Sequence, residues 1–412
     1  MSHLMLQSIN LYNQLAKNKL FSKSVNFNLK RIKLVLQKLN HPEKKLKNVI
    51  NIIGSDGKYS LLTSLKYFIE ANNQKTSAYI SPSLKNIRER FWMGNNFLSY
   101  QEIKKSMKVI EKQKINLTIF EVLTVIFILN AAKKNNDYNL IEAGALFAKD
   151  STNLFDFPKI QAIVNINKQH LNFLKKKTLN EVIYQKVGFL SNFTNIYIGK
   201  QKPLVLKKIH QHLKRNHSVV KYPNTWKLIQ SKGKFYYKDK KRKIILNTKY
   251  IHSKGLLENL CFAIKIALDL KINKKTIEKT IPNIKFEARI EYIQKGKLIK
   301  KIYKNEKFLL DGCHSEVSAK NLANYLKTLK VPIFGIWSMT KNKNPDNFIK
   351  QFKGIFKKII TIPIENESAA LSNKLLFQIA KNNNYSSETS KNFDEALKKI
   401  TSKEKKIICV FG

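Results

Sequence analysis

The sequence predicts an α/β protein with two domains, the larger built on a doubly wound, mostly parallel sheet and the smaller on a Rossmann-like sheet. Short runs of β-branched residues alternate with longer segments of helical periodicity, as in parallel strands joined by crossover helices. A glycine-containing loop directly follows the first of these strands, a position at which α/β folds bind anions. The chain has 412 residues, 43% of them hydrophobic, and can therefore bury two cores.

The first block of alternating segments runs from residue 49 to about residue 270. Its expected strands are short and rich in β-branched residues: Val49–Ile53, Ser77–Ile80, Tyr138–Glu142, Ala162–Ile166 and Ile196–Ile198. Its expected helices carry hydrophobic residues at helical spacing: Ser60–Ala71, Tyr100–Lys112, Phe120–Lys134, Leu179–Phe189 and Leu256–Leu270. With the N-terminal segment, this block is expected to form a domain of residues 1–286.

A second block follows the connection Lys271–Pro282 and is expected to form a domain of residues 287–412. Strands and helices alternate here again, in this order: Phe308–Leu310, Ser318–Lys327, Ile333–Ile336, Pro345–Phe356, Ile359–Ile362, Ala370–Ala380, Phe393–Ile400 and Lys406–Val410. No internal repeat is visible.

The chain is strongly basic, with 77 Lys and Arg against 28 Asp and Glu and a formal net charge of +49. Such a charge suits nucleic acid as a partner. The lysines are spread in small groups such as Lys175–Lys177, however, and we interpret them as a solvated surface that attracts small polyanions. Only Lys234–Lys238 interleaves aromatic residues with lysines, and it fits a hairpin strand equally well. Nucleic acid is not the expected partner, but a nucleic-acid-binding protein stays as an alternative.

Cysteine usage and hydropathy point to a cytoplasmic protein without a membrane partner. The three cysteines lie far apart and form no pattern typical of a disulfide framework or a zinc site. The longest apolar stretch, Phe120–Ala132, is too short to span a bilayer. The N-terminal segment has no secretory signal pattern.

The loop after Val49–Ile53 reads Gly54, Ser55, Asp56, Gly57, Lys58, Tyr59 and Ser60, and a helical segment follows it. Glycines let the backbone turn and point its N–H groups at phosphate oxygens, and the helix N-terminus adds positive potential. Lys58 supplies a mobile charge, and Ser60 can reach a phosphate or a metal ion. A glycine turn that only caps the helix is the alternative.

Further segments of the chain match one known pattern in order. They are Ser81–Leu84, Arg88–Arg90, Thr118–Glu121, Glu142–Gly144, Asp150–Asn153, Gln169–His170, Gln185–Gly188, Ala288–Glu291, Leu310–His314 and Met339–Pro345. Together with the loop, they resemble the motifs of the Mur ligase superfamily, in particular folylpolyglutamate synthase and dihydrofolate synthase. The resemblance covers residues 50 to 345.

The resemblance implies a P-loop-type ATPase domain followed by a glutamate-ligase domain. The implied reaction transfers the γ-phosphoryl group of ATP to a carboxylate of dihydropteroate or tetrahydrofolate, and the amine of L-glutamate then attacks the acyl phosphate. Two magnesium ions suit this chemistry because they neutralise the charge on the triphosphate. Relatives are usually monomers, and the choice of acceptor stays open.

The resemblance also assigns roles to individual residues. It implies magnesium ligands at Ser81, Glu142 and His170, and catalytic roles for Lys58, Glu142, His170 and a carbamylated Lys186. It implies nucleotide contacts from Gly54, Gly57, Lys58, Tyr59, Ser60, Asn259, Arg289, Asp311 and His314. It implies that the pterin-bearing substrate lies near Thr118, Ile119, Phe120, Lys149, Asp150 and Ser151, with Phe27–Lys30 as a cover.

Several positions depart from the family pattern. Asp56 replaces the Asn of the loop, and Gln169 replaces the Asp that precedes the histidine. Tyr59 replaces a glycine, Ser83 replaces a histidine, and Ser315 and Glu316 replace an Asn-Pro pair. Because these positions fall within the implied site, a slowed or inactive relative is a further alternative.

Overall fold

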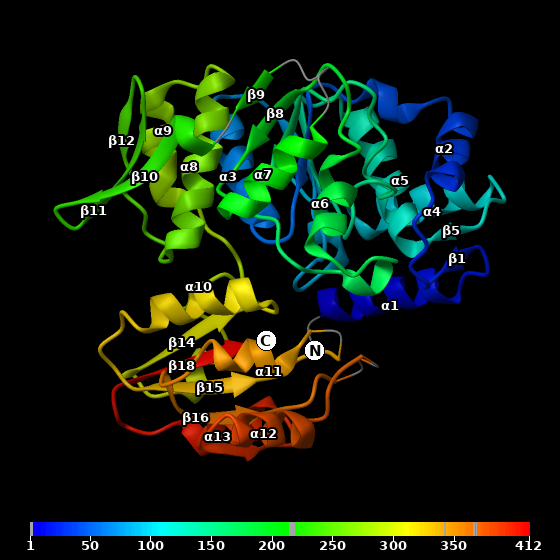
Figure 1. Cartoon of the computed structure of the whole chain (residues 1–412). Coiled ribbons are helices and arrows are strands. Elements are labelled where there is room, and N and C mark those ends of the chain that lie inside the picture. Colours follow the sequence, from blue (N-terminus) through cyan, green and yellow to red (C-terminus); the bar gives the residue numbers. More distant parts are fainter. Residues whose placement is uncertain (1–2, 214–218, 222, 342, 366, 368) are drawn as a thin grey trace. The chain divides into compact units, whose positions relative to one another are not determined.

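The structure is a computed structural model that describes residues 3–213, 219–221, 223–341, 343–365, 367 and 369–412 (Figure 1). Its contacts divide the chain into two compact units. The first comprises residues 1–247 and 258–284, and the second comprises residues 248–257 and 285–412. Asn342, within the predicted segment Met339–Pro345, lies outside the described residues.

The first unit is built on a seven-stranded sheet with the strand order β4-β3-β6-β2-β7-β8-β9. Only the β3–β4 pair is antiparallel among these described strands, so the predicted mostly parallel sheet is confirmed. The strands are β2 (Val49–Ile53), β3 (Thr76–Tyr79), β4 (Phe91–Met93), β6 (Tyr138–Glu142), β7 (Ile160–Ile163), β8 (Asn195–Ile198) and β9 (Val219–Lys221).

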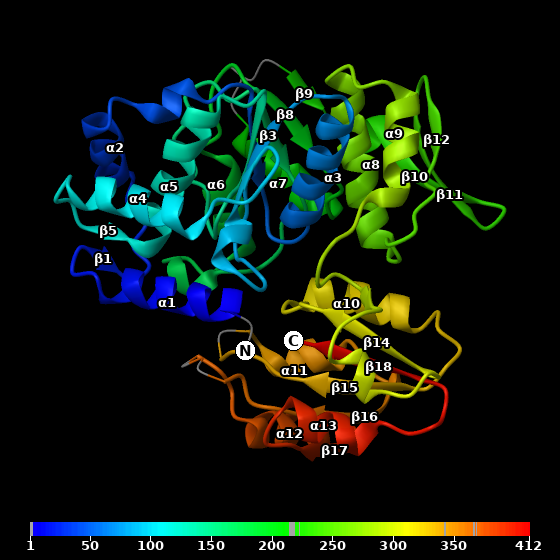
Figure 2. The same cartoon turned by 180° about the vertical axis from the view of Figure 1, so that it is seen from behind.

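Helices cover both faces of this sheet, with α5, α6 and α7 on one face and α3 on the other (Figures 1 and 2). Amphipathic periodicity explains most of them, whereas α5 is apolar around most of its circumference, and its apolar residues lie in a buried hydrophobic cluster. The helices are α1 (His3–Lys17), α2 (Leu29–Lys38), α3 (Lys58–Ala71), α4 (Tyr100–Glu111), α5 (Ile119–Lys134), α6 (Leu179–Val187), α7 (Pro203–His212), α8 (Lys254–Asp269) and α9 (Lys274–Thr280). Within the described residues, no helix combines the length and the apolar run needed to cross a bilayer.

Buried amide side chains link the central strands of the sheet. Asn51 of β2 faces Gln161 of β7 in register, and the Gln161 Nε2 atom donates to Asn51 Oδ1 at 3.4 Å. Asn51 Nδ2 donates in turn to the Thr152 carbonyl at 3.4 Å, and Gln161 Oε1 accepts from the Ser191 N–H at 2.8 Å. These bonds satisfy polar groups that would otherwise be costly to bury.

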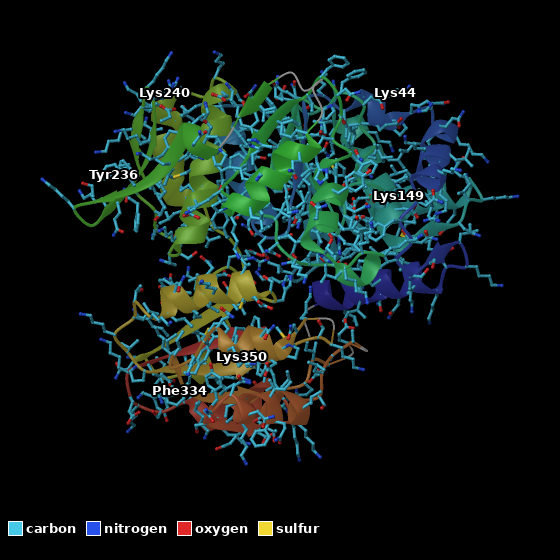
Figure 3. All side chains as sticks on the ribbon, viewed as in Figure 1. Lys44, Lys149, Tyr236, Lys240, Phe334 and Lys350 are labelled. Carbon is cyan, nitrogen blue, oxygen red and sulfur yellow. The ribbon has the colours of Figure 1, made fainter. Side chains whose placement is uncertain are left out.

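Two short sheets accompany the main one. β1 (Phe21–Ser22) pairs with β5 (Leu117–Thr118), and β10 (Trp226–Ser231), β11 (Lys234–Asp239) and β12 (Lys243–Ile245) form an antiparallel sheet. The predicted hairpin strand Lys234–Lys238 lies in β11, where Tyr237 is the buried residue. Tyr236 and Lys240 are labelled in Figure 3.

The second unit has a six-stranded sheet with the order β13-β14-β18-β15-β16-β17, in which only β13 is antiparallel. The strands are β13 (Glu291–Ile293), β14 (Glu306–Asp311), β15 (Ile333–Trp337), β16 (Phe356–Thr361), β17 (Ser387–Thr389) and β18 (Lys406–Phe411). The helices are α10 (Glu316–Leu326), α11 (Pro345–Lys350), α12 (Asn373–Asn382) and α13 (Phe393–Ile400). Separate core clusters on α10 and α13 cover its two faces.

Three predicted elements differ from the observed bounds by three or more residues at one end. The helix expected over Ala370–Ala380 begins only at Asn373, after its N-cap Ser372. The helix expected over Pro345–Phe356 ends at Lys350, because Gly354 takes a φ of 76° and Phe356 already begins β16. The strand expected over Ala162–Ile166 is β7, which ends at Ile163.

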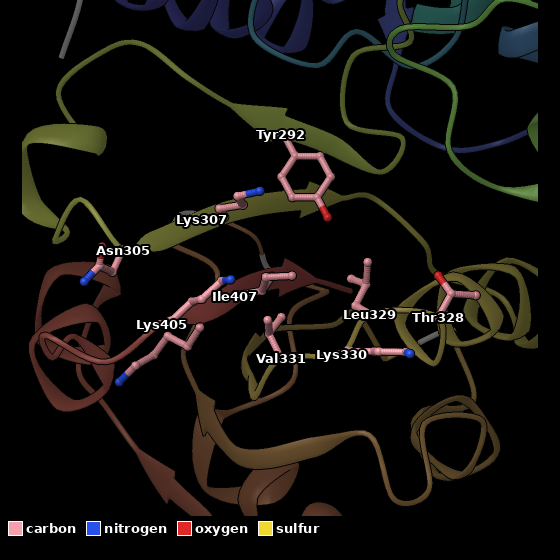
Figure 4. Close-up of a pocket in the computed structure, with 10 residues that line it drawn as sticks. Tyr292, Asn305, Lys307, Thr328, Leu329, Lys330, Val331, Lys405 and Ile407 are labelled. Carbon is pink, nitrogen blue, oxygen red and sulfur yellow. The ribbon is translucent and has the colours of Figure 1, made fainter.

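A small pocket opens at the amino ends of β14 and β18 in the second unit (Figure 4). Its volume is about 270 Å³. The floor includes Ile407 and Val331, and lysines such as Lys307 and Lys330 border it. None of the predicted site residues lines this pocket.

Candidate active site

The loop after β2 has a backbone that only glycine accommodates at two positions. Gly54 and Gly57 have φ values of 146° and 96°. A Cβ atom on Gly54 would lie 2.4 Å from the Val164 side chain, and one on Gly57 would lie 2.4 Å from Asn259. The loop is therefore packed closely on both sides, and α3 begins directly after it at Lys58.

Lys58 and Glu142 meet at the carboxyl edge of the sheet. Glu142 is the last residue of β6 and is buried, and its Oε1 atom lies 3.9 Å from Lys58 Nζ. The Lys58 ammonium group also donates to the carbonyls of Ser55 at 3.1 Å and Gly54 at 3.4 Å. Ser81, which follows β3, donates its N–H to Glu142 Oε2 at 3.2 Å. Three neighbouring strands thus bring charged and polar groups to one place, as open α/β sheets do.

Arg90 is a further charged residue at this edge. Its Nη1 atom donates to Ser81 Oγ at 3.1 Å, and its Nε atom donates to the Tyr12 hydroxyl at 3.2 Å. The side chain is buried, so the guanidinium group is held in place by these contacts. Arg90 belongs to the sequence motif Arg88–Arg90, to which the resemblance assigns no role. The signal available was its position shortly after Ser81.

His170 lies in the connection after β7, in a left-handed conformation with a φ of 58°. Its ring stacks on Phe173 with a centroid distance of 6.2 Å, and Phe27 packs edge-on against the same Phe173 at 5.3 Å. The N-terminal segment expected to act as a cover therefore contacts the histidine segment.

The donor atoms at this edge suit magnesium. Glu142 offers a buried carboxylate and Ser81 a hydroxyl, both hard oxygen donors of the kind that Mg²⁺ prefers, with waters and phosphate oxygens completing its shell. Within the described residues, no cluster of three His, Cys, Asp or Glu side chains forms a preassembled cage. The set fits an ion that a nucleotide helps to hold.

Lys186 is buried beneath the phosphate loop. Its Nζ atom donates to the Gly54 carbonyl at 2.8 Å and to the Ala145 carbonyl at 2.7 Å. Burial, together with the nearby Lys58 ammonium group, lowers the pKa of Lys186 to about 7 from its usual 10.5. The carbonyl of Gly54 thus accepts from both Lys58 and Lys186, and a substantial fraction of Lys186 is neutral at physiological pH.

Ser60 and Asn259 lie next to each other in the first unit. Asn259 Nδ2 donates to Ser60 Oγ at 2.9 Å, and Ser60 Oγ donates to the Gly57 carbonyl at 3.0 Å. Tyr59 is the second residue of α3 and is partly buried. The structure therefore brings Ser60 and Asn259 together at the phosphate loop.

Arg289, Asp311 and His314 lie in the second unit. Asp311 ends β14, and its Oδ2 atom accepts from the Ile290 N–H at 2.8 Å. Burial raises the pKa of Asp311, and the nearby Arg289 guanidinium opposes this shift. Ala288 and Ile290 both have a φ of 50°, a strained conformation for residues other than glycine. Such strain clusters at functional sites.

The residues expected near the substrate at the start of α5 have structural partners. Thr118 caps the helix, since its hydroxyl accepts from the Glu121 N–H at 3.2 Å and the Glu121 carboxylate accepts from the Thr118 N–H at 2.6 Å. Ile119 is the first helical residue. Phe120 is partly buried and contacts the Tyr79 ring at 6.1 Å, so it lies between core and surface.

Lys149, Asp150 and Ser151 follow the loop after β6. Lys149 is exposed (Figure 3). Asp150 is buried, and its Oδ1 atom accepts from the Thr152 N–H at 3.0 Å and hydroxyl at 2.5 Å. Ser151 Oγ shares a 2.7 Å hydrogen bond with Thr124 Oγ1. The carboxylate and the hydroxyl thus brace the loop from inside.

Comparisons with known proteins point to one family. No protein-family model matches the chain. A dihydrofolate synthase/folylpolyglutamate synthase from Buchnera aphidicola is 22% identical over 95% of this chain and 91% of the relative. The enzyme of the same name from Bacillus subtilis is 23% identical over 91% of this chain and 89% of the relative. The sequence motifs and these near full-length matches agree.

Over nearly its full length the chain is similar to folylpolyglutamate synthase/dihydrofolate synthase enzymes. Solved structures of this family share its fold. A Mycobacterium tuberculosis folylpolyglutamate synthase complexed with ADP has a TM-score of 0.86 at 17% identity and covers 99% of this chain and 96% of that one. An E. coli structure in complex with DHPP and ADP has a TM-score of 0.85 at 18% identity, with 98% and 94% covered. The family resemblance predicted from the motifs is therefore confirmed.

Proposed function

We propose that this chain is an ATP-dependent ligase that joins L-glutamate to dihydropteroate, to a folate, or to both through an acyl phosphate. The observation that carries the proposal is the Gly54 carbonyl, to which the loop lysine Lys58 and the buried Lys186 both donate. Glu142 lies 3.9 Å from Lys58, at the end of the adjacent strand. The proposed phosphate-binding loop and the proposed metal-binding carboxylate thus share one edge of the sheet.

Different residues of the first unit have different proposed roles in phosphoryl transfer. Lys58 and the N–H groups at the start of α3 would hold the phosphates of ATP and stabilise the charge that develops on the transferred group. Glu142, Ser81 and His170 would hold magnesium, which neutralises the triphosphate when bound. Arg90 orients the Ser81 hydroxyl through its 3.1 Å hydrogen bond.

Lys186 is the proposed site of carbamylation. Only the neutral amine attacks carbon dioxide, forming an N–C bond and releasing a proton, and the pKa of about 7 supplies that neutral amine. The product carries a negative charge in place of a positive one. Beside Lys58, this charge would remove a repulsion and support a second metal ion.

Relatives supply the substrate classes. The structure of a bifunctional relative with Mn, AMPPNP and L-glutamate bound has a TM-score of 0.82 at 18% identity. We extend these ligand classes to this chain, with Arg289, Asp311 and His314 as proposed nucleotide contacts and residues 118–120 and 149–151 as proposed substrate contacts. A cytoplasmic monomer is part of the same proposal.

The test is phosphate release from ATP by the purified protein with magnesium and bicarbonate. Release is expected only when L-glutamate and either dihydropteroate or tetrahydrofolate are both present, and the better acceptor identifies the substrate. Lys58→Met should abolish release, whereas Lys240→Met, on the exposed hairpin, should not change it. ATP hydrolysis that ignores both glutamate and acceptor would contradict the proposal.

A further inference from the structure

Two positions at which this chain departs from its family pattern contact each other. Asp56 stands in the loop where the family has Asn, and Gln169 stands before His170 where the family has Asp. The two residues are 113 positions apart in sequence, yet Gln169 Nε2 donates to Asp56 Oδ2 at 3.1 Å. An acid and an amide have thus changed places across one hydrogen bond.

The contact is part of a dense connection between the phosphate loop and the segment after β7. The Ser55 N–H donates to the Asn165 carbonyl at 2.8 Å, and Ser55 Oγ donates to the Asn167 carbonyl at 3.2 Å. Asn167 Nδ2 donates to Asp56 Oδ2 at 2.5 Å. One carboxylate oxygen therefore accepts from two amide side chains of the segment that directly precedes His170.

We propose that Asp56 supplies, from the loop after β2, the carboxylate that the family pattern places before the histidine, and that Gln169 supplies the matching amide. Asp56 is then a positioning residue, because it holds residues 165–170 against the loop. This inference rests on the proposed function. It explains why two unfavourable departures occur together.

Charge explains why the pair carries one acid and not two or none. Two carboxylates within hydrogen-bonding distance would repel each other and lose the bond between them. Two amides would keep a hydrogen bond but would remove a negative charge that acts on Lys186. The Asp56–Gln169 pair keeps both the hydrogen bond and the negative charge, with the carboxylate on the loop and the amide before His170.

The experiment is a double-mutant cycle with Asp56→Asn, Gln169→Asp and the Asp56→Asn/Gln169→Asp combination, which restores the family arrangement. Each single change is expected to lower the ligase rate and weaken Mn²⁺ binding in the presence of ATP, followed by electron paramagnetic resonance. The combination should recover most of both losses. Coupling between contacting residues corresponds to about 2- to 150-fold.

Two controls make the outcome decisive. Asp394→Asn removes one exposed negative charge in α13 and should leave both readouts unchanged. The melting temperature of each ligand-free variant reports the same coupling independently of catalysis. If the wild type forms no amide, the proposed function fails, while the Mn²⁺ and melting data still test the pair.

The inference is overturned if Asp56→Asn alone behaves as wild type, which would make the charge irrelevant. It is also overturned if the combined variant shows the product of the two single losses. Asn can accept the same hydrogen bonds through its carbonyl oxygen, so the first variant separates charge from shape.

Discussion

Among the described residues, each unit buries one lysine almost completely, and the two lysines have different surroundings. Lys406, at the amino end of β18, donates to Ile400 O at 2.9 Å and lies 3.9 Å from the Glu306 carboxylate. Lys186 has two backbone carbonyls as its described hydrogen-bond partners, and burial together with the nearby Lys58 ammonium group lowers its pKa. A buried lysine next to a carboxylate forms a structural ion pair, which stabilises its charged form. A buried lysine that contacts only backbone carbonyls loses its proton more easily.

The variant Lys186→Ala tests most directly whether Lys186 has a role in the reaction. Ligase activity is expected to fall by about 10- to 100-fold or more, because loss of a group that supports a metal site typically costs about 10- to 100-fold. Phosphate release measures the loss, and circular dichroism should show an intact fold. Full turnover in this variant would remove Lys186 from the mechanism.

Lys406→Met should show the opposite pattern. It strands the buried Glu306 carboxylate, which accepts from the N–H groups of Tyr303 at 2.8 Å and Ser402 at 3.0 Å. We expect a loss of about 3–5 kcal/mol in the free energy of unfolding from urea titration. Where the variant stays folded, its ligase rate should match that of the wild type. A loss of rate without a loss of stability would show that Lys406, like Lys186, acts in the reaction and not in the fold.

Carbamylation of Lys186 should depend on pH. Its folded-state pKa of about 7 lies below the usual 10.5, so the neutral amine increases as pH rises from 6 to 8. The unfolded chain binds the extra proton between these two values, so this group's destabilising effect is complete below pH 7 and fades toward pH 10.5. A ¹³C carbamate signal from labelled bicarbonate should grow over pH 6–8 and be absent in Lys186→Ala. A signal independent of pH would contradict the lowered pKa.

The smallest effect is expected from Lys406→Met combined with Glu306→Leu. Replacing both partners of a buried ion pair by apolar groups is often neutral, so stability should return to within about 1 kcal/mol of wild type. Urea titration beside the single variant measures the recovery. No recovery would show that the neighbouring hydrogen bonds, and not the pair, stabilise this corner.

Sequence patterns predicted the sheet strands best where they were most apolar. Val49–Ile53 and Tyr138–Glu142 have the bounds expected, because both strands are buried along their whole length. Short edge strands such as β4, β9, β13 and β17 were not predicted, since three-residue runs carry little periodicity. The helices α1, α2, α7 and α9 were missed because lysine and asparagine dilute their apolar faces.

The contacts of the candidate site also fall into those that the sequence could predict and those that it could not. The meeting of Lys58 with Glu142 follows from strand order, because carboxyl ends of parallel neighbours share an edge. The contact of Asp56 with Gln169 depends on loop conformations that no local pattern encodes. Arg90 was similarly hidden, since its partners Tyr12 and Ser81 lie on separate segments. The assigned roles of the site residues stay predictions.

The amides that join Asn51 to Gln161 bear on how this chain avoids misfolding. Isoleucine-rich strands are nearly interchangeable, so apolar contacts alone would tolerate several alignments of β2 against β7. A slide of β2 by one residue would turn Asn51 toward the opposite face of the sheet and separate it from Gln161, so that both buried amides would lose this hydrogen bond. The hydrogen-bonded pair therefore favours one register of β2 against β7, at the cost of some apolar contact.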